Sequence, residues 1–485
     1  MTVKPRLRAL PRALIAAAVC SPMLATAAPE PLTIRFATFN ASLNRNFDGQ
    51  MLDDLAGLST DAQAANRTQQ MRNVAEIIQR VNPDVLLVNE FDYTTATRNG
   101  KSAPQLFQDN FLSVGQNGYG APASALPISF AHHVYVPSNT GVPSGFDLDN
   151  NGSIGGGNDA YGFGNYPGQF GFVIFSKHPI DQAAVRTFQT FLWKDMPGAL
   201  LPDNAATPAA GDFYSAEELA VFRLSSKNHV DVPVNIAGNT VHLLASHPTP
   251  PVFDGAEDRN GRRNHDEIRF WHDYVSGANY MTDDQGRVGG LSSGARYVLT
   301  GDMNADPFDG DATGDPASAY LMDPTRFLAS ETDSALTPDS LGGPAGAAAD
   351  GNANNTHVGN PAFDTADFAD GSPGNLRVDY VLPDADAVLA LQGIGRAEDG
   401  TSDPTGVFWP SPTLPGGDPN PLWQLVGRFG SGSSPFNLYS GFRSSDHKAV
   451  WVDLQITPVP EPSTIVLFAA GLGFLGASAL RRSRR

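Results

Sequence analysis

The stretch Gly301-Asp302-Met303-Asn304-Ala305-Asp306-Pro307 directly follows the short apolar segment Tyr297-Val298-Leu299-Thr300. The apolar segment predicts a buried strand, and the Asp-Pro pair beyond it predicts a turn. Side chains alternate along a strand, so we expect Asp302 and Asn304 on one face and Met303 on the other. An acid and an amide at a strand end can position a water molecule or a metal ion, although a simple Asx-rich turn has the same pattern.

Polar residues also stand at the ends of other apolar segments. Strands are expected over 32–40, 84–90, 168–176, 240–246, 376–382 and 448–454, and helices over 64–80 and 263–275. The polar residues at their ends are Asn40, Glu90, His247, Asp379, Asp446 and His447. Each of them alone fits a turn former or a structural histidine. Together with Asp302 and Asn304, they indicate a shared polar site.

Five motifs in this order resemble those of the endonuclease/exonuclease/phosphatase superfamily. They are Thr38-Phe39-Asn40, Asn89-Glu90, Gly301-Asp302-Met303-Asn304, Val378-Asp379-Tyr380 and Ser445-Asp446-His447. The resemblance covers about residues 32–456. It implies an α+β fold, a four-layer α/β sandwich in which two mixed β-sheets pack face to face with helices outside. Long loop insertions at 92–169, 182–229, 307–374 and 384–440 would enlarge this core, and the active site would lie at one rim.

The resemblance also implies a metal site. Glu90 would be the main ligand, assisted by Asn40 and Asp446. Mg²⁺ prefers oxygen ligands and keeps several of its waters, so one or two carboxylates are enough to bind it. We therefore expect Mg²⁺ or Mn²⁺ as the cofactor.

Five residues receive catalytic roles from the resemblance. Asp302 would orient or deprotonate the attacking water, with Asn304 holding the same geometry. His447 would contact the scissile phosphate or act in acid–base catalysis, and Asp379 would fix its ring and favour its cationic form. His247 corresponds to a second histidine that binds the phosphate.

A separate motif suggests a calcium loop. Asp147, Asp149, Asn151 and Gly152 match the first half of an EF-hand-type loop. The bidentate glutamate expected at the twelfth position is missing, but Asp159 lies next to that position, and no flanking helices are predicted. The segment is thus either a structural Ca²⁺ loop or a solvated Asx turn.

Three arginines form a local basic group in an otherwise acidic chain. Arg259, Arg262 and Arg263 lie just before or at the start of the helix expected over 263–275. They suit contacts to a phosphate-rich ligand. The alternative is a solvated loop at the helix start.

The two ends of the chain carry targeting patterns. Residues 1–28 have a basic start, an apolar run and a small-residue cleavage site, which predicts a secretory signal peptide. Residues 459–485 combine Pro460-Glu461-Pro462, an apolar run and an arginine-rich tail, and resemble the PEP-CTERM sorting signal. That resemblance implies export to the cell envelope or the extracellular space, transient anchoring by a C-terminal membrane helix, and processing by an exosortase-type enzyme. The catalytic domain would then occupy 29–458.

The composition is that of a loop-rich globular protein: 41% of the 485 residues are hydrophobic, 17% are charged, and 49 are Gly and 38 Pro. The formal net charge is -19, and eight of the 32 basic residues lie in the terminal segments, so the body is more acidic still. Such a body has no general attraction for nucleic acid or anionic lipid. The single cysteine, Cys20, lies in the predicted signal peptide, which excludes a disulfide in the mature protein.

Three functions remain open at this point. The first is an exported, divalent-metal-dependent phosphoesterase, acting as a monomer on nucleic acid, a lipid or a small phosphate ester. The second is a non-catalytic surface or matrix protein on the same fold. The third is a calcium-stabilised adhesion module centred on residues 147–159.

Overall fold

The computed structural model of the protein describes residues 29–204, 206–328, 337–389, 405–426 and 444–459. Residues Pro31–Val459 form one compact unit. The predicted signal peptide and the predicted C-terminal membrane helix lie outside the described residues. Within the described ranges, no helix is both long and apolar enough to cross a membrane.

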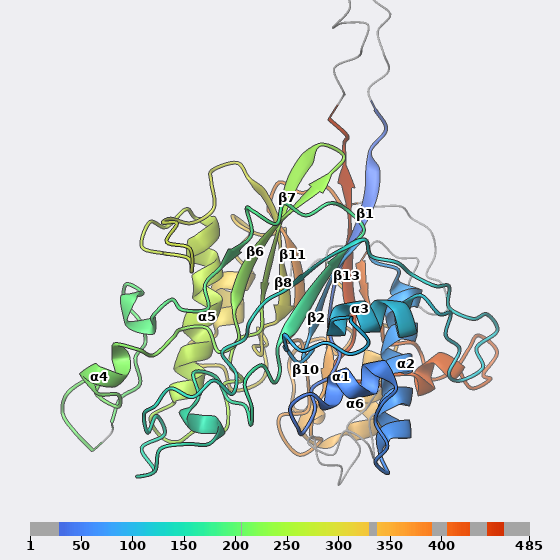
Figure 1. Ribbon diagram of the computed structural model, residues 1–485. Helices are drawn as coiled ribbons and strands as arrows, with labels where there is room; N and C mark the ends of the chain where they lie inside the picture. Colours follow the sequence, from blue (N-terminus) through green and yellow to red (C-terminus); the bar gives the residue numbers. More distant parts are fainter. Residues whose placement is uncertain (1–28, 205, 329–336, 390–404, 427–443, 460–485) are drawn as a thin grey trace, which may run out of the picture. The chain divides into compact units, whose positions relative to one another are not determined.

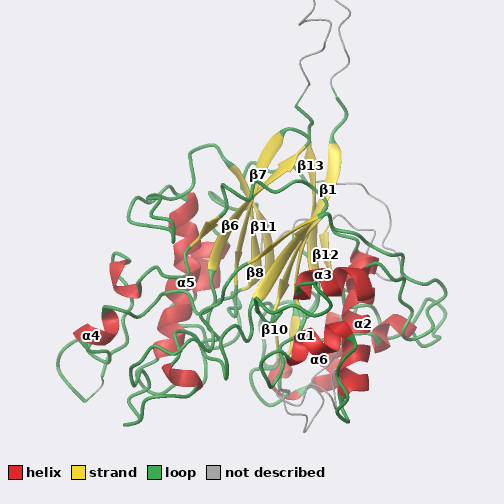
Figure 2. Ribbon diagram, in the orientation of Figure 1, coloured by secondary structure: helices red, strands yellow, loops and turns green. Residues whose placement is uncertain are grey.

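The first sheet has six strands in the order β12-β13-β1-β2-β4-β3 (Figures 1 and 2). These strands are Thr405–Val407, Val450–Ile456, Leu32–Asn40, Val85–Asn89, Phe172–Ser176 and His132–Tyr135. Strands β1 and β2 are parallel, whereas all other neighbouring pairs are antiparallel. The sheet is therefore mixed, as expected.

The second sheet has five strands in the order β11-β8-β7-β6-β5. These strands are Asp379–Pro383, Arg296–Asp302, Asn239–Ser246, His229–Ile236 and Arg186–Thr187. Only β7 and β8 are parallel, so this sheet is mixed too. A small separate ribbon pairs β9 (Ala366–Asp367) with β10 (Asn375–Leu376).

Helices cover the outer faces of the two sheets (Figure 2). Helices α1 (Gln50–Ala56) and α2 (Ala64–Val81) lie on the side of the first sheet, and α5 (Arg259–Val275) lies on the side of the second. Strand alternation divides β7 between two cores: Leu243 packs between the sheets, whereas Leu244 packs with α5. The predicted four-layer sandwich is confirmed.

The remaining helices are short and belong mostly to connecting segments. They are α3 (Ala103–Phe107), α4 (Ala216–Leu219) and α6 (Gly343–Asp350), the π-helices η1 (Gln108–Leu112) and η4 (Ala317–Leu321), and the 3-10 helices η2 (Gly157–Asp159), η3 (Trp193–Asp195), η5 (Asn352–Asn355) and η6 (Pro421–Gln424). Segment 92–169, expected to be mostly insertion, also supplies edge strand β3 to the first sheet.

One core strand was missed from sequence. Strand β6 lies between β5 and β7, and its buried apolar residues Val230, Val232, Val234 and Ile236 alternate regularly, with Pro233 at an intervening position. Proline cannot donate a ladder hydrogen bond and normally argues against an interior strand. Here Pro233 is paired with His242 over an otherwise regular antiparallel register.

Strand register brings the predicted site residues to one edge of the sandwich. Asp379 pairs directly with Asp302 across β11 and β8, and Asn40 pairs with Asn89 across β1 and β2. Gly301 allows the close approach of β7 and β8, because a Cβ there would lie 2.2 Å from the carbonyl oxygen of Ser246. A glycine before Asp302 is thus required by packing.

Candidate active site

Asp302 is the centre of the site. It ends β8 and is only 1% exposed. Its Oδ2 accepts a hydrogen bond from Asn40 Nδ2 (3.0 Å), and lies 3.3 Å from His247 Nε2 and 3.7 Å from His447 Nε2. Its Oδ1 accepts the backbone N–H of Asn304 (3.0 Å). Side chains from both sheets therefore converge on one carboxylate.

Asn304 reaches this site in a way that strand alternation does not explain. Strand β8 ends at Asp302, and Asn304 has a left-handed backbone conformation (φ 51°). Its side chain donates to the carbonyl oxygen of Pro248 (3.2 Å). The expected shared face along a continuing strand was wrong: a turn, closed by the bond from Asn304 N–H to Asp302, holds the two residues together.

His447 forms a buried pair with Asp379. Its Nδ1 lies 2.8 Å from Asp379 Oδ2, and its ring is 5% exposed. Burial alone would lower the pKa of His447, but the carboxylates of Asp379 and Asp302 outweigh it and raise this pKa above its ordinary value. The raised pKa favours the imidazolium form of His447 at neutral pH. Thr365 Oγ1 accepts the backbone N–H of Asp379 (2.9 Å) and fixes the strand at this point.

The pKa of His247 is shifted in the opposite direction. It follows β7, is 3% exposed, and has its pKa lowered well below the ordinary value by burial and then by nearby Lys227 and His447. A neutral ring can donate Nε2–H to Asp302. Its Nδ1 is buried and has no hydrogen-bond partner among the described residues. The pKa values of the two histidines of the site are therefore shifted in opposite directions.

Lys227 belongs to the site and was not recognised from sequence. It is 6% exposed, donates to the carbonyl oxygen of Pro248 (3.2 Å), and lies within electrostatic reach of Asp302 and Glu90. Burial lowers its pKa. Lys227 precedes β6, which runs antiparallel to β7, so the start of β6 meets the carboxyl end of β7. Because β6 itself was not predicted, the position of Lys227 at the rim was not predicted either.

Glu90 and Asp446 form the acidic side of the site. Glu90 follows β2 in a left-handed backbone conformation (φ 58°), which is uncommon for a non-glycine residue and is characteristic of functional sites. Burial and the neighbouring charge of Asp446 raise the pKa of Glu90 to about 7. Asp446 also accepts a hydrogen bond from Ser42 Oγ (3.1 Å). A divalent cation would relieve the repulsion between these two carboxylates.

A second group of potential metal ligands lies beside them. Asp302, Asp379 and His447 bring one ligand atom each within 4.8 Å of one another. However, Nδ1 of His447 already contacts Asp379, and the raised pKa of His447 favours its protonated form, which has no free lone pair for a metal. The donor set of Glu90, Asp446 and the neighbouring Asn40 fits a hard oxygen-seeking cation better.

The predicted calcium loop forms a compact acidic turn. Asp147, Asp149 and Asp159 bring carboxylate oxygens within 4.8 Å of one another. The two oxygens of Asp147 accept the backbone N–H groups of Asn151 (3.0 Å) and Gly152 (2.7 Å). Such bonds also stabilise an ordinary Asx turn, so calcium binding stays a prediction.

The basic group lies on a helix and not in a loop before it. Helix α5 begins at Arg259, four residues earlier than expected. Arg259 forms an ion pair with Glu257, and Arg262 lies 3.8 Å from Asp258. Both arginines are therefore partly neutralised within the chain.

Arg263 is an interior residue. It is 5% exposed and donates to the backbone carbonyl oxygens of Leu224 (2.8 Å), Arg223 (2.9 Å) and Tyr161 (2.5 Å). Its guanidinium also lies over the ring of Phe222. These contacts tie α5 to two loops, so Arg263 has a structural role in this arrangement.

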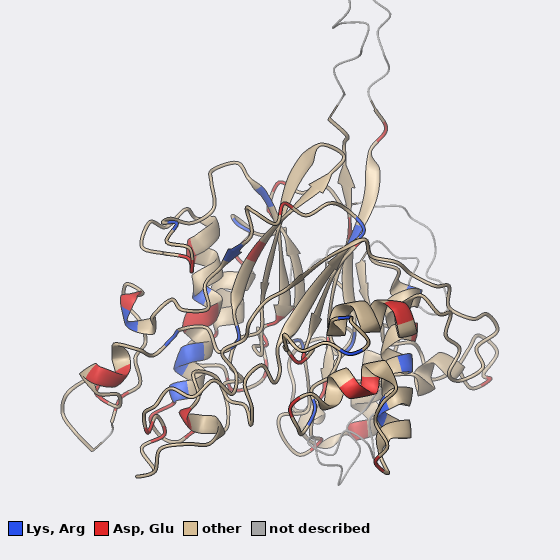
Figure 3. Ribbon diagram, viewed as in Figure 1, with Lys and Arg blue, Asp and Glu red and all other residues tan. Residues whose placement is uncertain are grey.

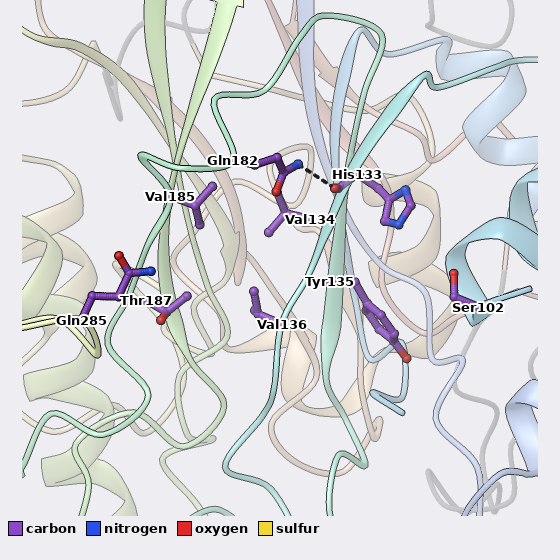
Figure 4. A pocket seen from close by; sticks show the side chains of 9 residues that line it. All are labelled: Ser102, His133, Val134, Tyr135, Val136, Gln182, Val185, Thr187 and Gln285. Atoms are coloured by element: carbon purple, nitrogen blue, oxygen red, sulfur yellow. Dashed lines mark hydrogen bonds between the residues drawn. The ribbon is translucent and has the colours of Figure 1, made fainter. Parts of the chain in front are cut away.

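A cavity of about 430 Å³ lies away from this site (Figure 4). It opens between β3 and the segment around β5, and Gln182 Nε2 donates to the carbonyl oxygen of His133 at its edge (3.1 Å). It shares no lining residue with the site around Asp302, and no carboxylate, lysine or arginine lines it. Its lining includes His133 and Tyr135 but none of the carboxylates that would hold a divalent cation.

Several solved structures are similar to this chain. An endonuclease/exonuclease/phosphatase from Beutenbergia cavernae is 14% identical, with 88% of this chain and 73% of that chain covered and a TM-score of 0.41. A family protein from Leptotrichia buccalis is 12% identical (87% and 100% covered, TM-score 0.38). Sphingomyelinase C from Streptomyces griseocarneus is 12% identical (87% and 99% covered, TM-score 0.37). Comparison with curated proteins gave no match.

Two family models match the chain in separate ranges. Residues 458–485 match the PEP-CTERM protein-sorting motif, which confirms the resemblance noted at the C-terminus. Residues 37–447 match the endonuclease/exonuclease/phosphatase family, and this range includes every residue of the site around Asp302. With most of its length matched and its strand-end motifs assembled at one rim, the chain belongs to the endonuclease/exonuclease/phosphatase family.

Proposed function

We propose that the protein is an exported, divalent-metal-dependent phosphoesterase that hydrolyses a phosphodiester or phosphomonoester bond by in-line attack of water. One observation carries this proposal: Asp302 lies within 3.0–3.7 Å of Asn40, His247 and His447, which come from both sheets. A carboxylate with these neighbours can orient a water molecule toward a bound phosphate.

Glu90 and Asp446 would hold a Mg²⁺ or Mn²⁺ ion, with the amide oxygen of Asn40 as a further ligand. The raised pKa of Glu90, caused by burial and by Asp446, supports this assignment because a cation would stabilise the ionised form. The ion would neutralise charge on the phosphate oxygens.

The protein's own side chains would divide the remaining work. Asp302 would orient the attacking water and take its proton, while Asn304 keeps the Asp302 carboxylate in place. His447, positively charged through Asp379, would stabilise the negative charge that develops on the phosphate. Neutral His247 would fix Asp302 from the other side, and Lys227 would add a second positive charge at the rim.

The C-terminal sorting motif supports export. We propose that the chain is anchored transiently by its C-terminal segment, processed by an exosortase-type enzyme, and then acts as a monomer in the cell envelope or outside the cell. The predicted signal peptide at 1–28 is consistent with this route.

The proposal is tested by hydrolysis assays on residues 31–459, the compact unit that holds both sheets. Substrates are bis-p-nitrophenyl phosphate, p-nitrophenyl phosphate, plasmid DNA and sphingomyelin, with Mg²⁺, with Mn²⁺ and with EDTA. We expect metal-dependent turnover that is lost in Asp302→Asn. Asp48→Asn, which removes an exposed charge from a loop at the same rim, is the matched control and should keep full activity. Turnover that survives EDTA or Asp302→Asn would refute the proposal.

A further inference from the structure

Four phenylalanines are exposed among the described residues. They are Phe47 (69%), Phe163 (54%), Phe253 (74%) and Phe308 (48%). Single exposed apolar residues are normal on a protein surface. These four, however, share a location.

All four lie in loops at the catalytic rim. Phe47 is in the loop after β1 (41–49), Phe253 in the loop after β7 (247–258), and Phe308 in the loop after β8 (303–316). Phe163 is in the loop 136–171 that enters β4, whose first residue pairs with Asn89 at the end of β2. We call these four segments the rim loops; they leave the lower edge of the two sheets in Figure 1.

The exposure of Phe253 is built into the backbone. Phe253 has a left-handed conformation (φ 70°), which is a strained state for a bulky side chain. Both of its neighbours are tied to Asn260 in the first turn of α5: Asn260 Nδ2 donates to Val252 O (2.7 Å), and Asn260 N donates to Asp254 Oδ2 (2.6 Å). The ring is therefore held in solvent by a fixed loop.

Phe308 and Phe163 are held in comparable ways. Asp306 Oδ1 accepts the N–H of Phe308 (2.7 Å), and Asp309 binds the N–H of Val358 (3.0 Å), a neighbour that is itself 77% exposed. Phe163 lies between two glycines, and a Cβ on Gly162 would meet the carbonyl oxygen of Ser226 at 1.9 Å. Ser226 directly precedes Lys227 of the site. The exposed rings thus stand on rigid supports close to the catalytic residues.

The charge of the rim loops restricts what they can contact. Their charged residues are carboxylates, with the single exception of Arg45, which is buried against Asp54 (2.8 Å). The arginines at the start of α5 are paired with Glu257 and Asp258. Figure 3 shows acidic residues along these lower loops. An acidic surface repels nucleic acid and anionic lipid, but it attracts ammonium groups, which also bind to aromatic faces.

We propose that the catalytic rim docks on a zwitterionic lipid surface, with the four phenylalanine rings inserted at the interface and the acidic loops facing the cationic ends of the headgroups. The inference rests on the proposed phosphoesterase function and names its substrate class: a phosphodiester in a lipid headgroup. Apolar side chains that insert at a bilayer interface add binding strength in proportion to the apolar area they bury.

The test measures binding of residues 31–459 to vesicles by co-sedimentation in EDTA, which removes metal bridges. This unit lacks the C-terminal apolar segment, so that segment cannot contribute. One set of vesicles is phosphatidylcholine, and the other contains added phosphatidylglycerol. The double variant Phe253→Ser, Phe308→Ser is compared with Val388→Ser, which alters a 58% exposed residue beyond the opposite end of β11. An oligothymidylate is the competing ligand.

We expect binding to phosphatidylcholine vesicles, weaker binding when phosphatidylglycerol is added, and a loss of roughly tenfold per ring in the double variant. Val388→Ser should bind like the wild type. Absence of vesicle binding by the wild type, or an unchanged affinity of the double variant, would overturn the inference. The inference would also be overturned if the wild type bound the oligothymidylate and the double variant did not, because the rings would then stack on bases. Vesicle binding without turnover of bis-p-nitrophenyl phosphate or lipid would refute the phosphoesterase and leave the docking surface standing.

Discussion

Replacement of Asp379 by asparagine isolates the contribution of charge at His447. The asparagine oxygen can still accept a hydrogen bond from Nδ1, so ring orientation is retained, while the carboxylate 2.8 Å away is removed. In the wild type, Asp379 and Asp302 raise the pKa of His447 against the effect of burial. In the variant Asp302, at 3.7 Å, and Asp446 still oppose burial, and we expect the pKa to return toward its ordinary value of 6.5.

The size of the effect follows from the protonated fraction of His447. A group with a pKa of 6.5 is about 3% protonated at pH 8, about 24% at pH 7 and about 90% at pH 5.5. If the imidazolium is the active form, the variant loses about 30-fold in kcat at pH 8, about fourfold at pH 7, and almost nothing at pH 5.5. Because the pKa of His447 is higher in the folded than in the unfolded protein, its ion pair with Asp379 stabilises the fold fully at pH values below the unfolded-state pKa. This contribution to the free energy of unfolding is lost as pH rises through the folded-state pKa.

The assay is metal-saturated hydrolysis of bis-p-nitrophenyl phosphate at pH 5.5–8.5, expressed as the ratio of wild type to variant at each pH. The ratio cancels the pH dependence of the attacking water. Asp384→Asn is the control, because Asp384 follows the same strand and pairs with Arg296 away from the site. A defect that is equal at all pH values, or no defect at pH 8, would refute a charged role for His447.

Three further predictions concern binding and stability. Because the pKa of Glu90 is raised to about 7, the affinity for Mg²⁺ or Mn²⁺ should fall as pH drops from 8 to 6, with a proton released on binding. Calorimetry measures both the affinity and the released proton, and Glu90→Gln should remove the pH dependence of the affinity. An affinity of the wild type that does not change with pH would contradict the assignment of Glu90 as a metal ligand. Arg263→Met should lower the free energy of unfolding by about 2–4 kcal/mol, because three hydrogen bonds to backbone carbonyl oxygens are lost. The KM of the folded variant for a phosphodiester should stay unchanged. A raised KM with unchanged stability would instead show that Arg263 contacts the phosphate. If residues 147–159 bind Ca²⁺, added Ca²⁺ should raise the Tm of the wild type but not of Asp147→Asn, and an equal Tm with and without the ion identifies a plain Asx turn.

The sequence by itself determined the elements with strong local patterns. The apolar segments that predict strands at 32–40, 84–90 and 240–246 became β1, β2 and β7, and the one-faced periodicity after residue 64 became α2. It also placed Asn40, Glu90, His247, Asp302 and His447 beside strand ends. These features depend on neighbours within a few residues, so a short window contains their physical cause.

Tertiary structure alone decided which strand ends meet. Asn40 and Asp302 are 262 residues apart and are joined across two sheets by a 3.0 Å hydrogen bond. The alternating apolar residues of β6 were not recognised as a strand, and it is the pairing with β5 and β7 that makes it an interior strand with Lys227 just before its start. The opposite pKa shifts of His247 and His447 likewise follow from burial and from charged groups brought in by other elements. Protonation and assembly of the site depend on the three-dimensional distances between groups, and those distances exist only once the sheets have packed.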